Sequence, residues 1–148
     1  MPRDTHMQAN FSRLDPEVEI PTRAHIGDAA VDLQTRTDFS LEPGERASIP
    51  TGLAVAIPEG YAGLVLPRSG HARRSGVGVV NGPGLIDSGY RGEVAVLLIN
   101  HGSERVSFAK GERIAQLAVV PVVPVEWVEV DTLDDTERGS GGFGSTGS

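Results

Sequence analysis

The apolar residues of this 148-residue chain fall in short runs, and most of these runs end at a glycine or a proline. The clearest runs are residues 52–57, 61–66, 76–80 and 92–100. No stretch of useful length has the 3.6-residue period of an amphipathic helix, and only residues 71–75 leave room for one short helical turn. Short strands with turn residues between them are typical of a β-sandwich or a β-barrel. We therefore expect an all-β fold.

Composition narrows the class of protein. The length suits one domain with a substantial core, and the absence of cysteine excludes a disulfide scaffold and a cysteine-based zinc site. A net charge of −7 argues against sequence-independent binding of nucleic acid, which needs clustered lysine and arginine. No apolar stretch reaches membrane-spanning length, and the first residues lack an apolar signal segment. We expect a cytoplasmic protein whose partners are neither nucleic acid nor membrane.

Two apolar segments carry more specific expectations. Residues 92–100 alternate between two faces that are both apolar, which predicts a strand buried on both sides. Residues 114–130 are rich in valine, but Pro121 and Pro124 cannot donate hydrogen bonds to a sheet. These prolines predict either a sheet edge or a bend between two strands.

The two ends of the chain differ from its middle. Residues 1–12 are polar and mixed, so we expect a flexible leader. The domain is then expected over residues 13–131, followed by an arm over residues 132–148. Residues 139–148 hold five glycines and no charge, which is typical of a flexible linker.

Two residues of the arm argue against a pure linker. Phe143 is a costly residue to leave exposed, and Arg138 directly precedes the glycines. Gly139 and Gly144 have the spacing of a P-loop, but Ser145 stands at the position of its lysine, so that motif is rejected. Backbone N–H groups of a glycine-rich turn still suit phosphate oxygens.

Three internal segments carry groups of chemical interest. Residues 67–74 hold three arginines with no acidic residue, which fits either a polyphosphate site or a solvated turn. Residues 84–92 suggest a bulged hairpin, in which Asp87 is a candidate general base or ordinary turn chemistry. Asp28 and Asp32 would share a face if both lay in a strand, where they would suit Mg²⁺ through water; the alternative is a capped turn. The four histidines show no metal-ligand spacing.

Five segments in this order resemble the trimeric deoxyuridine triphosphate nucleotidohydrolases, the dUTPases. They are residues 30–33, 67–70, 84–92, 113–117 and 138–147, which read AVDL, PRSG, GLIDSGYRG, RIAQL and RGSGGFGSTG. Each is weak alone, but the order and spacing of all five are specific, and the resemblance spans roughly residues 13–148.

The resemblance implies a fold and an activity. The fold would be a jelly-roll-like β-sandwich or distorted barrel, assembled as a homotrimer whose active sites each draw on three subunits. The reaction would convert dUTP to dUMP and pyrophosphate by attack of water on the α-phosphorus, with Mg²⁺ on the triphosphate. It would keep uracil out of DNA and supply dUMP for thymidylate synthesis.

The resemblance also assigns roles around the nucleoside. Asp87 would activate the attacking water and hold the 3′-hydroxyl. Tyr90 would lie under the deoxyribose and exclude a 2′-hydroxyl. Asn81 and backbone groups of a hairpin over residues 79–90, with Gly84 and Ile86 among them, would recognise uracil.

Further roles concern the triphosphate and the arm. Arg68, Ser69 and Gly70 of a second subunit would bind phosphates with Gln116 nearby, and Asp32 would contact Mg²⁺ through water. The arm would close over a neighbour's site as a lid. Its substrate-binding residues would be Arg138, Phe143, which stacks on uracil, and Gly144, Ser145 and Thr146.

Three positions depart from the family's usual pattern, and two other functions stay open. Ala30 stands where glycine is usual, His71 where leucine is usual, and Gly82 where serine or alanine is common. We expect tuned affinity rather than lost activity. A dCTP deaminase-like enzyme and a nucleotide-responsive regulatory protein use related sandwiches, because a fold does not by itself specify a function.

Overall fold

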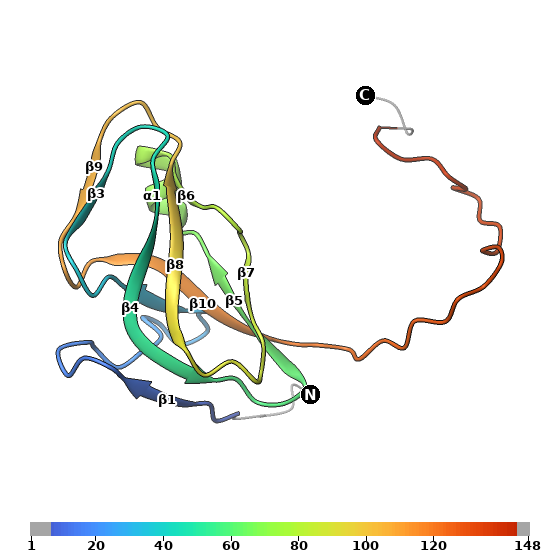
Figure 1. Ribbon diagram of the computed structural model, residues 1–148, viewed down its shortest axis with the longest axis horizontal. Helices are drawn as coiled ribbons and strands as arrows, with labels where there is room; N and C mark the ends of the chain where they lie inside the picture. The colour runs from blue at the N-terminus through green and yellow to red at the C-terminus, as the bar shows by residue number, and fades with distance from the viewer. Residues whose placement is uncertain (1–6, 145–148) are drawn as a thin grey trace.

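The computed structural model describes residues 7–144 as two four-stranded antiparallel sheets and one two-stranded sheet (Figure 1). The first sheet has the order β1 (Asn10–Arg13), β4 (Arg46–Ala56), β8 (Glu93–Asn100), β6 (Val77–Val79). The second has the order β2 (Val31–Gln34), β10 (Arg113–Pro121), β5 (Tyr61–Leu66), β7 (Gly84–Ile86). The small sheet pairs β3 (Phe39–Leu41) with β9 (Val106–Phe108), and α1 spans Ser69–Ser75. The expected all-β, jelly-roll-like sandwich is confirmed.

One hydrophobic core lies between the sheets. Alternate residues of β8 point into it, where they meet apolar side chains of β4, β5 and β10. Asn100 is fully buried at the end of β8, and its side-chain amide donates to the carbonyl oxygens of Leu41 and Glu104. Its Oδ1 accepts the N–H of Gly102, so this polar side chain satisfies its hydrogen bonds inside the core.

A bulge interrupts β4 at Gly52. Pro50 pairs with Ala95 and Ala54 with Glu93, so β4 holds more residues than β8 between these two pairs. Gly52 has a φ of +71°, and a Cβ there would lie 2.5 Å from Cγ2 of Val18. Only glycine suits this backbone and this space.

The expectation that residues 92–100 are buried on both sides is wrong for this chain. Val94, Val96 and Leu98 of β8 are buried, but Ala95 and Leu97 are exposed. β8 lies within a two-layer sandwich, so one of its faces covers the core and the other turns outward.

The expected hairpins over residues 79–90 and 84–92 are also wrong. β6 pairs with β8, whereas β7 pairs with β5 in the other sheet. The segments on either side of β7 therefore connect the two sheets, and the local turn signals could not show this because they do not specify a pairing partner.

Three boundaries differ from their expectations. Residues 10–12 of the expected leader belong to β1, which pairs with residues 53–56 of β4. Residues 114–130 contribute to one strand, β10 (Arg113–Pro121), which is central to its sheet rather than at the edge. α1 has seven residues, beginning at Ser69, and is longer than the expected single turn.

The chain leaves the sandwich after β10 and continues into the arm. Residues 122–144 form neither helix nor strand, and Figure 1 shows them extending away from the sheets. Several apolar side chains here are exposed, including Val123, Trp127 and Leu133. Within residues 7–144, no helix has the length and apolar character needed to cross a membrane.

Candidate active site

A cavity of about 220 Å³, here called the β7 cavity, gathers the residues expected to recognise a nucleoside. Gly84 lets the chain come close to its neighbours, because a Cβ at this position would lie 3.2 Å from Cβ of Val65 and 3.4 Å from Nδ2 of Asn81. The cavity is lined by Val65, Asn81, Gly84, Leu85, Ile86, Tyr90, Glu93, Val94, Ala95 and Leu97. The lining thus combines mostly apolar residues with one amide side chain, one carboxylate residue and one aromatic residue.

The turn between β7 and β8 carries Asp87 and Tyr90. The N–H of Tyr90 donates to the carbonyl oxygen of Asp87 at 3.1 Å. The guanidinium of Arg91 donates to the carbonyl oxygens of Ser88 and Tyr90 at 2.7 and 2.9 Å. These bonds hold the turn, which leaves Asp87 exposed between Ile86 and Tyr90, two residues that line the β7 cavity.

A second cavity, of about 390 Å³ and here called the α1 cavity, gathers the residues expected to bind phosphates. It lies where β2, β10 and the start of α1 meet, and its lining combines an arginine pair with a hydroxyl and a glycine. The lining residues are Ala24, His25, Asp28, Ala29, Ala30, Asp32, Arg68, Ser69, Gly70, Arg113 and Gln116. The two cavities have no lining residue in common.

Asp32 holds the arginines of the α1 cavity. Its Oδ1 lies 3.2 Å from Nε of Arg68, and its Oδ2 lies 3.6 Å from Nε of Arg113. Nε2 of Gln116 donates to the carbonyl oxygen of Pro67 at 2.9 Å, which fixes the residue before Arg68 against β10. The cavity therefore presents two oriented guanidinium groups, which suit anionic oxygens.

Two residues of the α1 cavity, Arg113 and His25, were not singled out as site residues from the sequence. In a regular strand, Arg113 and Gln116 would face opposite sides, because side chains alternate. A register shift between Arg113 and Ala115 breaks the alternation, so both residues line one cavity. Arg113 begins the segment over residues 113–117 that resembles the family, so the resemblance could have indicated it. No sequence pattern around His25 indicated that it lies at this site.

Asp28 does not join Asp32 on a strand. β2 begins at Val31, and Oδ2 of Asp28 accepts the backbone N–H of His25 at 2.8 Å. Asp28 therefore caps a turn, the alternative weighed from the sequence. Within residues 7–144, no group of three or more histidine or acidic side chains is placed to hold a metal ion.

The three departures from the family's pattern have local explanations. Ala30 lines the α1 cavity without a positive φ, so its Cβ causes no backbone strain. His71 turns Nε2 to 2.8 Å from the carbonyl oxygen of Arg113 and packs its ring edge-on against Phe108. A Cβ at Gly82 would lie 3.1 Å from the carbonyl oxygen of Val79, so this tight turn favours glycine.

The described arm residues Arg138, Phe143 and Gly144 line neither cavity. Phe143 is fully exposed, and the guanidinium of Arg138 donates to the carbonyl oxygen of Gly141 within the arm. Gly144 has a positive φ of 87°. Ser145 and Thr146 lie outside the described residues.

The fold and its two cavities define a jelly-roll-like β-sandwich protein in which two arginines line one cavity. A family model described as dUTPase matches residues 16–147. The chain therefore belongs to the dUTPase family.

Individual relatives agree with this assignment. The chain is 49% identical over 143 residues to the deoxyuridine 5′-triphosphate nucleotidohydrolase of Rhodococcus erythropolis, covering 96% of this chain and 87% of the relative. Staphylococcus bacteriophage 80alpha dUTPase with dUPNHPP superposes with a TM-score of 0.88 at 31% identity, covering 95% of this chain and 99% of that chain. A mutant dUTPase from phage phi11 of S. aureus, described with a structural Mg(II) ion, superposes with a TM-score of 0.79 at 28% identity, covering 85% of this chain and 98% of that chain.

Proposed function

We propose that this chain hydrolyses dUTP to dUMP and pyrophosphate as a Mg²⁺-dependent homotrimer. The observation that carries the proposal is the separation of the two cavities. Nucleoside-type groups line the β7 cavity and phosphate-type groups line the α1 cavity, with no residue shared. In our proposal, one dUTP occupies the β7 cavity of one subunit and the α1 cavity of another, which requires a closed assembly of identical chains.

Asp87 is the proposed catalytic residue. Its carboxylate stands exposed on the turn beside the β7 cavity, where it can accept a proton from water. The water oxygen would bond to the α-phosphorus while the bond from that phosphorus to the bridging oxygen breaks. Pyrophosphate would leave with the electron pair of that bond. Asp87 would also hold the 3′-hydroxyl.

The β7 cavity is proposed to select deoxyuridine. Asn81 and backbone groups at Gly84 and Ile86 would hydrogen-bond the uracil edge, and a cytosine would present its donors and acceptors in the opposite order. The ring of Tyr90 would lie under the deoxyribose and leave no room for a 2′-hydroxyl.

The α1 cavity is proposed to bind the triphosphate. Arg68, Ser69 and Gly70 would contact phosphate oxygens, with Gln116 supporting the segment through Pro67. Asp32 would orient Arg68 and contact Mg²⁺ only through water. When bound, Mg²⁺ supplies positive charge that stabilises the leaving pyrophosphate.

The arm is proposed to close over a neighbouring subunit's site. Phe143 would stack on uracil, while Arg138, Gly144, Ser145 and Thr146 would bind the phosphate end. Closure would exclude bulk water from the reaction. The full exposure of Phe143 in the single chain supports a role on another surface, because removing an aromatic ring from water lowers the free energy. The enzyme would act in the cytoplasm, where it limits uracil in DNA and supplies dUMP for thymidylate synthesis.

Pyrophosphate release from dUTP, UTP, dCTP and dTTP with Mg²⁺ tests the function. We expect dUTP to be hydrolysed far faster than the other three nucleotides. Asp87→Asn should lower kcat by about 10²–10⁴-fold, the usual range for losing a general base. Equal rates on dUTP and UTP, or full activity of Asp87→Asn, would contradict the proposal.

The alternatives have distinct readouts. A dCTP deaminase-like activity would release ammonia from dCTP, and the names of the relatives reported above favour hydrolysis instead. The similarity to the phage 80alpha dUTPase supports testing for a regulatory role, because phage dUTPases are described as controlling transfer of virulence genes. Protein capture from a lysate with and without dUTP would reveal such a role beside catalysis.

A further inference from the structure

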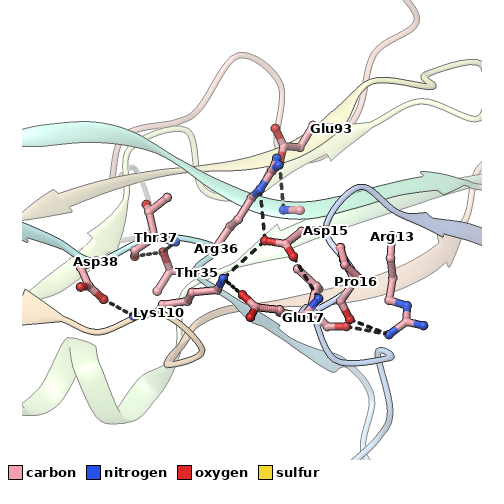
Figure 2. A network of polar contacts seen from close by, with 12 residues as sticks. Arg13, Asp15, Pro16, Glu17, Thr35, Arg36, Thr37, Asp38, Glu93 and Lys110 are labelled. Atoms are coloured by element: carbon pink, nitrogen blue, oxygen red, sulfur yellow. Dashed lines mark hydrogen bonds and ion pairs between the residues drawn. The ribbon is translucent and has the colours of Figure 1, made fainter.

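The carboxylate of Glu93 is anchored from two sides at the start of β8. Its Oε1 accepts the guanidinium Nη1 of Arg36 at 2.9 Å and the backbone N–H of Gly52 at 2.9 Å (Figure 2). The second bond comes from the glycine of the β4 bulge, whose backbone is buried. Glu93 is thus tied to segments that lie 41 and 57 residues away in the sequence.

The backbone of the same residue holds the ring of Tyr90. The Tyr90 hydroxyl donates to the carbonyl oxygen of Glu93 at 2.9 Å. The ring folds over Gly92, where a Cβ would lie 2.4 Å from the Tyr90 hydroxyl oxygen. The position of the Tyr90 ring in the β7 cavity therefore depends on where the first residues of β8 lie.

The anchor of Glu93 continues into a charged network on the side of the molecule shown in Figure 2. Arg36 lies between Glu93 and Asp15, with its Nε 3.7 Å from Oδ2 of Asp15. Lys110 contacts the same Asp15 oxygen at 3.5 Å and also pairs with Glu17. Among the described residues, Arg36 and Glu93 link this network to the Tyr90 turn, whereas Lys110 contacts Asp15 and Glu17 instead.

We propose that Glu93 is a positioning residue for sugar discrimination. Through Arg36 and the β4 bulge it fixes the carbonyl oxygen that holds the Tyr90 hydroxyl, and so it sets the space beneath the sugar. The inference rests on the proposed function, in which Tyr90 lies under the deoxyribose. A ribose differs from a deoxyribose at this position by a single oxygen atom. A small displacement of the Tyr90 ring would therefore be enough to admit the 2′-hydroxyl.

The test is the ratio of kcat/KM for dUTP to that for UTP. In Glu93→Ala we expect the ratio to fall about tenfold or more, mainly through a higher rate on UTP, because the ring is free to shift. Glu93→Gln keeps an oxygen that can accept the N–H of Gly52, so its ratio should lie between those of the wild type and Glu93→Ala. Lys110→Met is the matched control, because it weakens the same network without touching Glu93; it should lower the unfolding midpoint in urea and leave the ratio unchanged.

A double-mutant cycle separates positioning from general stability. Tyr90→Phe removes the hydroxyl that Glu93 holds, so adding Glu93→Ala to it should produce little further loss of the ratio. Independent, multiplicative losses would overturn the inference. If Glu93→Ala does not fold, Arg36→Met carries the same test, and an unchanged ratio there overturns it.

The wild-type chain distinguishes this inference from the proposed function. Failure of the wild type to prefer dUTP over UTP would contradict the proposed function itself. A selective wild type whose ratio is unchanged in Glu93→Ala would contradict only the role of Glu93.

Discussion

Asp32 and Arg68 form an ion pair that joins β2 to the segment preceding α1, with Oδ1 of Asp32 3.2 Å from Nε of Arg68. The second carboxylate oxygen faces Arg113, so one negative charge orients two arginines. Each side chain of the Asp32–Arg68 pair remains about a quarter to a third exposed. Solvent screening therefore limits its contribution to stability, and its main consequence is the direction in which Arg68 points.

Replacing Asp32 should affect catalysis more than folding. In Asp32→Asn we expect kcat/KM for dUTP to fall at least about tenfold, because Arg68 loses its orientation. The free energy of unfolding should change by less than about 1 kcal/mol, as for other solvent-exposed pairs. Asp28→Asn is the matched control, because it removes the same charge from the α1 cavity. The Asp28 carboxylate accepts the backbone N–H of His25 and does not pair with Arg68 or Arg113. Equal losses of activity in the two variants would show that charge, not orientation, matters.

Removing the arm should separate activity from folding. Deletion of residues 138–148 is expected to lower turnover of dUTP by at least about 10²-fold, because the proposed lid and its arginine are lost. The melting temperature should stay near that of the full chain, since the described part of this segment contributes no strand or helix to the sandwich. Circular dichroism and pyrophosphate release measure the two effects. An unchanged rate would mean that the arm is only a linker.

The β4 bulge should be intolerant of a side chain. Gly52→Ala combines a left-handed backbone with a Cβ placed 2.5 Å from Val18, whereas Gly44→Ala has a φ of +80° and open space around its Cβ. We expect Gly44→Ala to lower the free energy of unfolding by about 1–2 kcal/mol. Gly52→Ala should cost about 1–3 kcal/mol more, the usual range for overpacking. Unfolding in urea gives both values, and equal losses would show that Val18 moves aside freely.

The charged network of Figure 2 should make stability depend on acid pH. The N–H of Glu17 lowers the pKa of Asp15 from its ordinary value of 3.8, and Lys110 and Arg36 act in the same direction. Folding thus favours the ionised carboxylate. Its contribution is full above the ordinary pKa and is lost as pH falls through the lowered value in the folded chain.

The measurement compares unfolding midpoints of the wild type and Asp15→Asn across pH. The difference should be largest near neutral pH and should shrink at pH values below 3.8. Lys110 has a raised pKa, because Glu17 stabilises its ammonium group, so its contribution persists below its ordinary pKa and is lost only at strongly alkaline pH. Asp131→Asn, at an exposed position just before the arm, serves as control and should show no such pH dependence. A constant difference between wild type and Asp15→Asn would refute this assignment.

Local sequence signals located the segments of the candidate site, while the resemblance to a family selected their residues. Asp87 and Tyr90 stand in a turn of glycines, and Arg68, Ser69 and Gly70 follow directly after the strand expected over residues 61–66, which the structure confirms as β5. Such signals depend on neighbouring residues alone, so they mark turns without knowledge of the fold, but by themselves they left an ordinary turn as the alternative at both places.

Other features of the site depend on contacts between distant segments. The bulge in β10 that places Arg113 beside Gln116 leaves no mark in the alternation of apolar and polar residues. Glu93 appeared only as the first residue of a strand, because its partners Arg36 and Gly52 are remote in the sequence. The exposure of Ala95 and Leu97 likewise follows from the layer in which β8 lies.

By itself, the sequence determined that the chain builds a β-sandwich from short strands, and it identified the residue types around Asp87 and Arg68. The cause is local: side-chain alternation and the backbone preferences of glycine and proline act within a few residues. Only the tertiary structure decided which sheet receives each strand, that the two cavities are separate, and that Glu93 supports Tyr90. These outcomes depend on pairing, bulges and ion pairs between remote segments, which are selected by packing of the whole core.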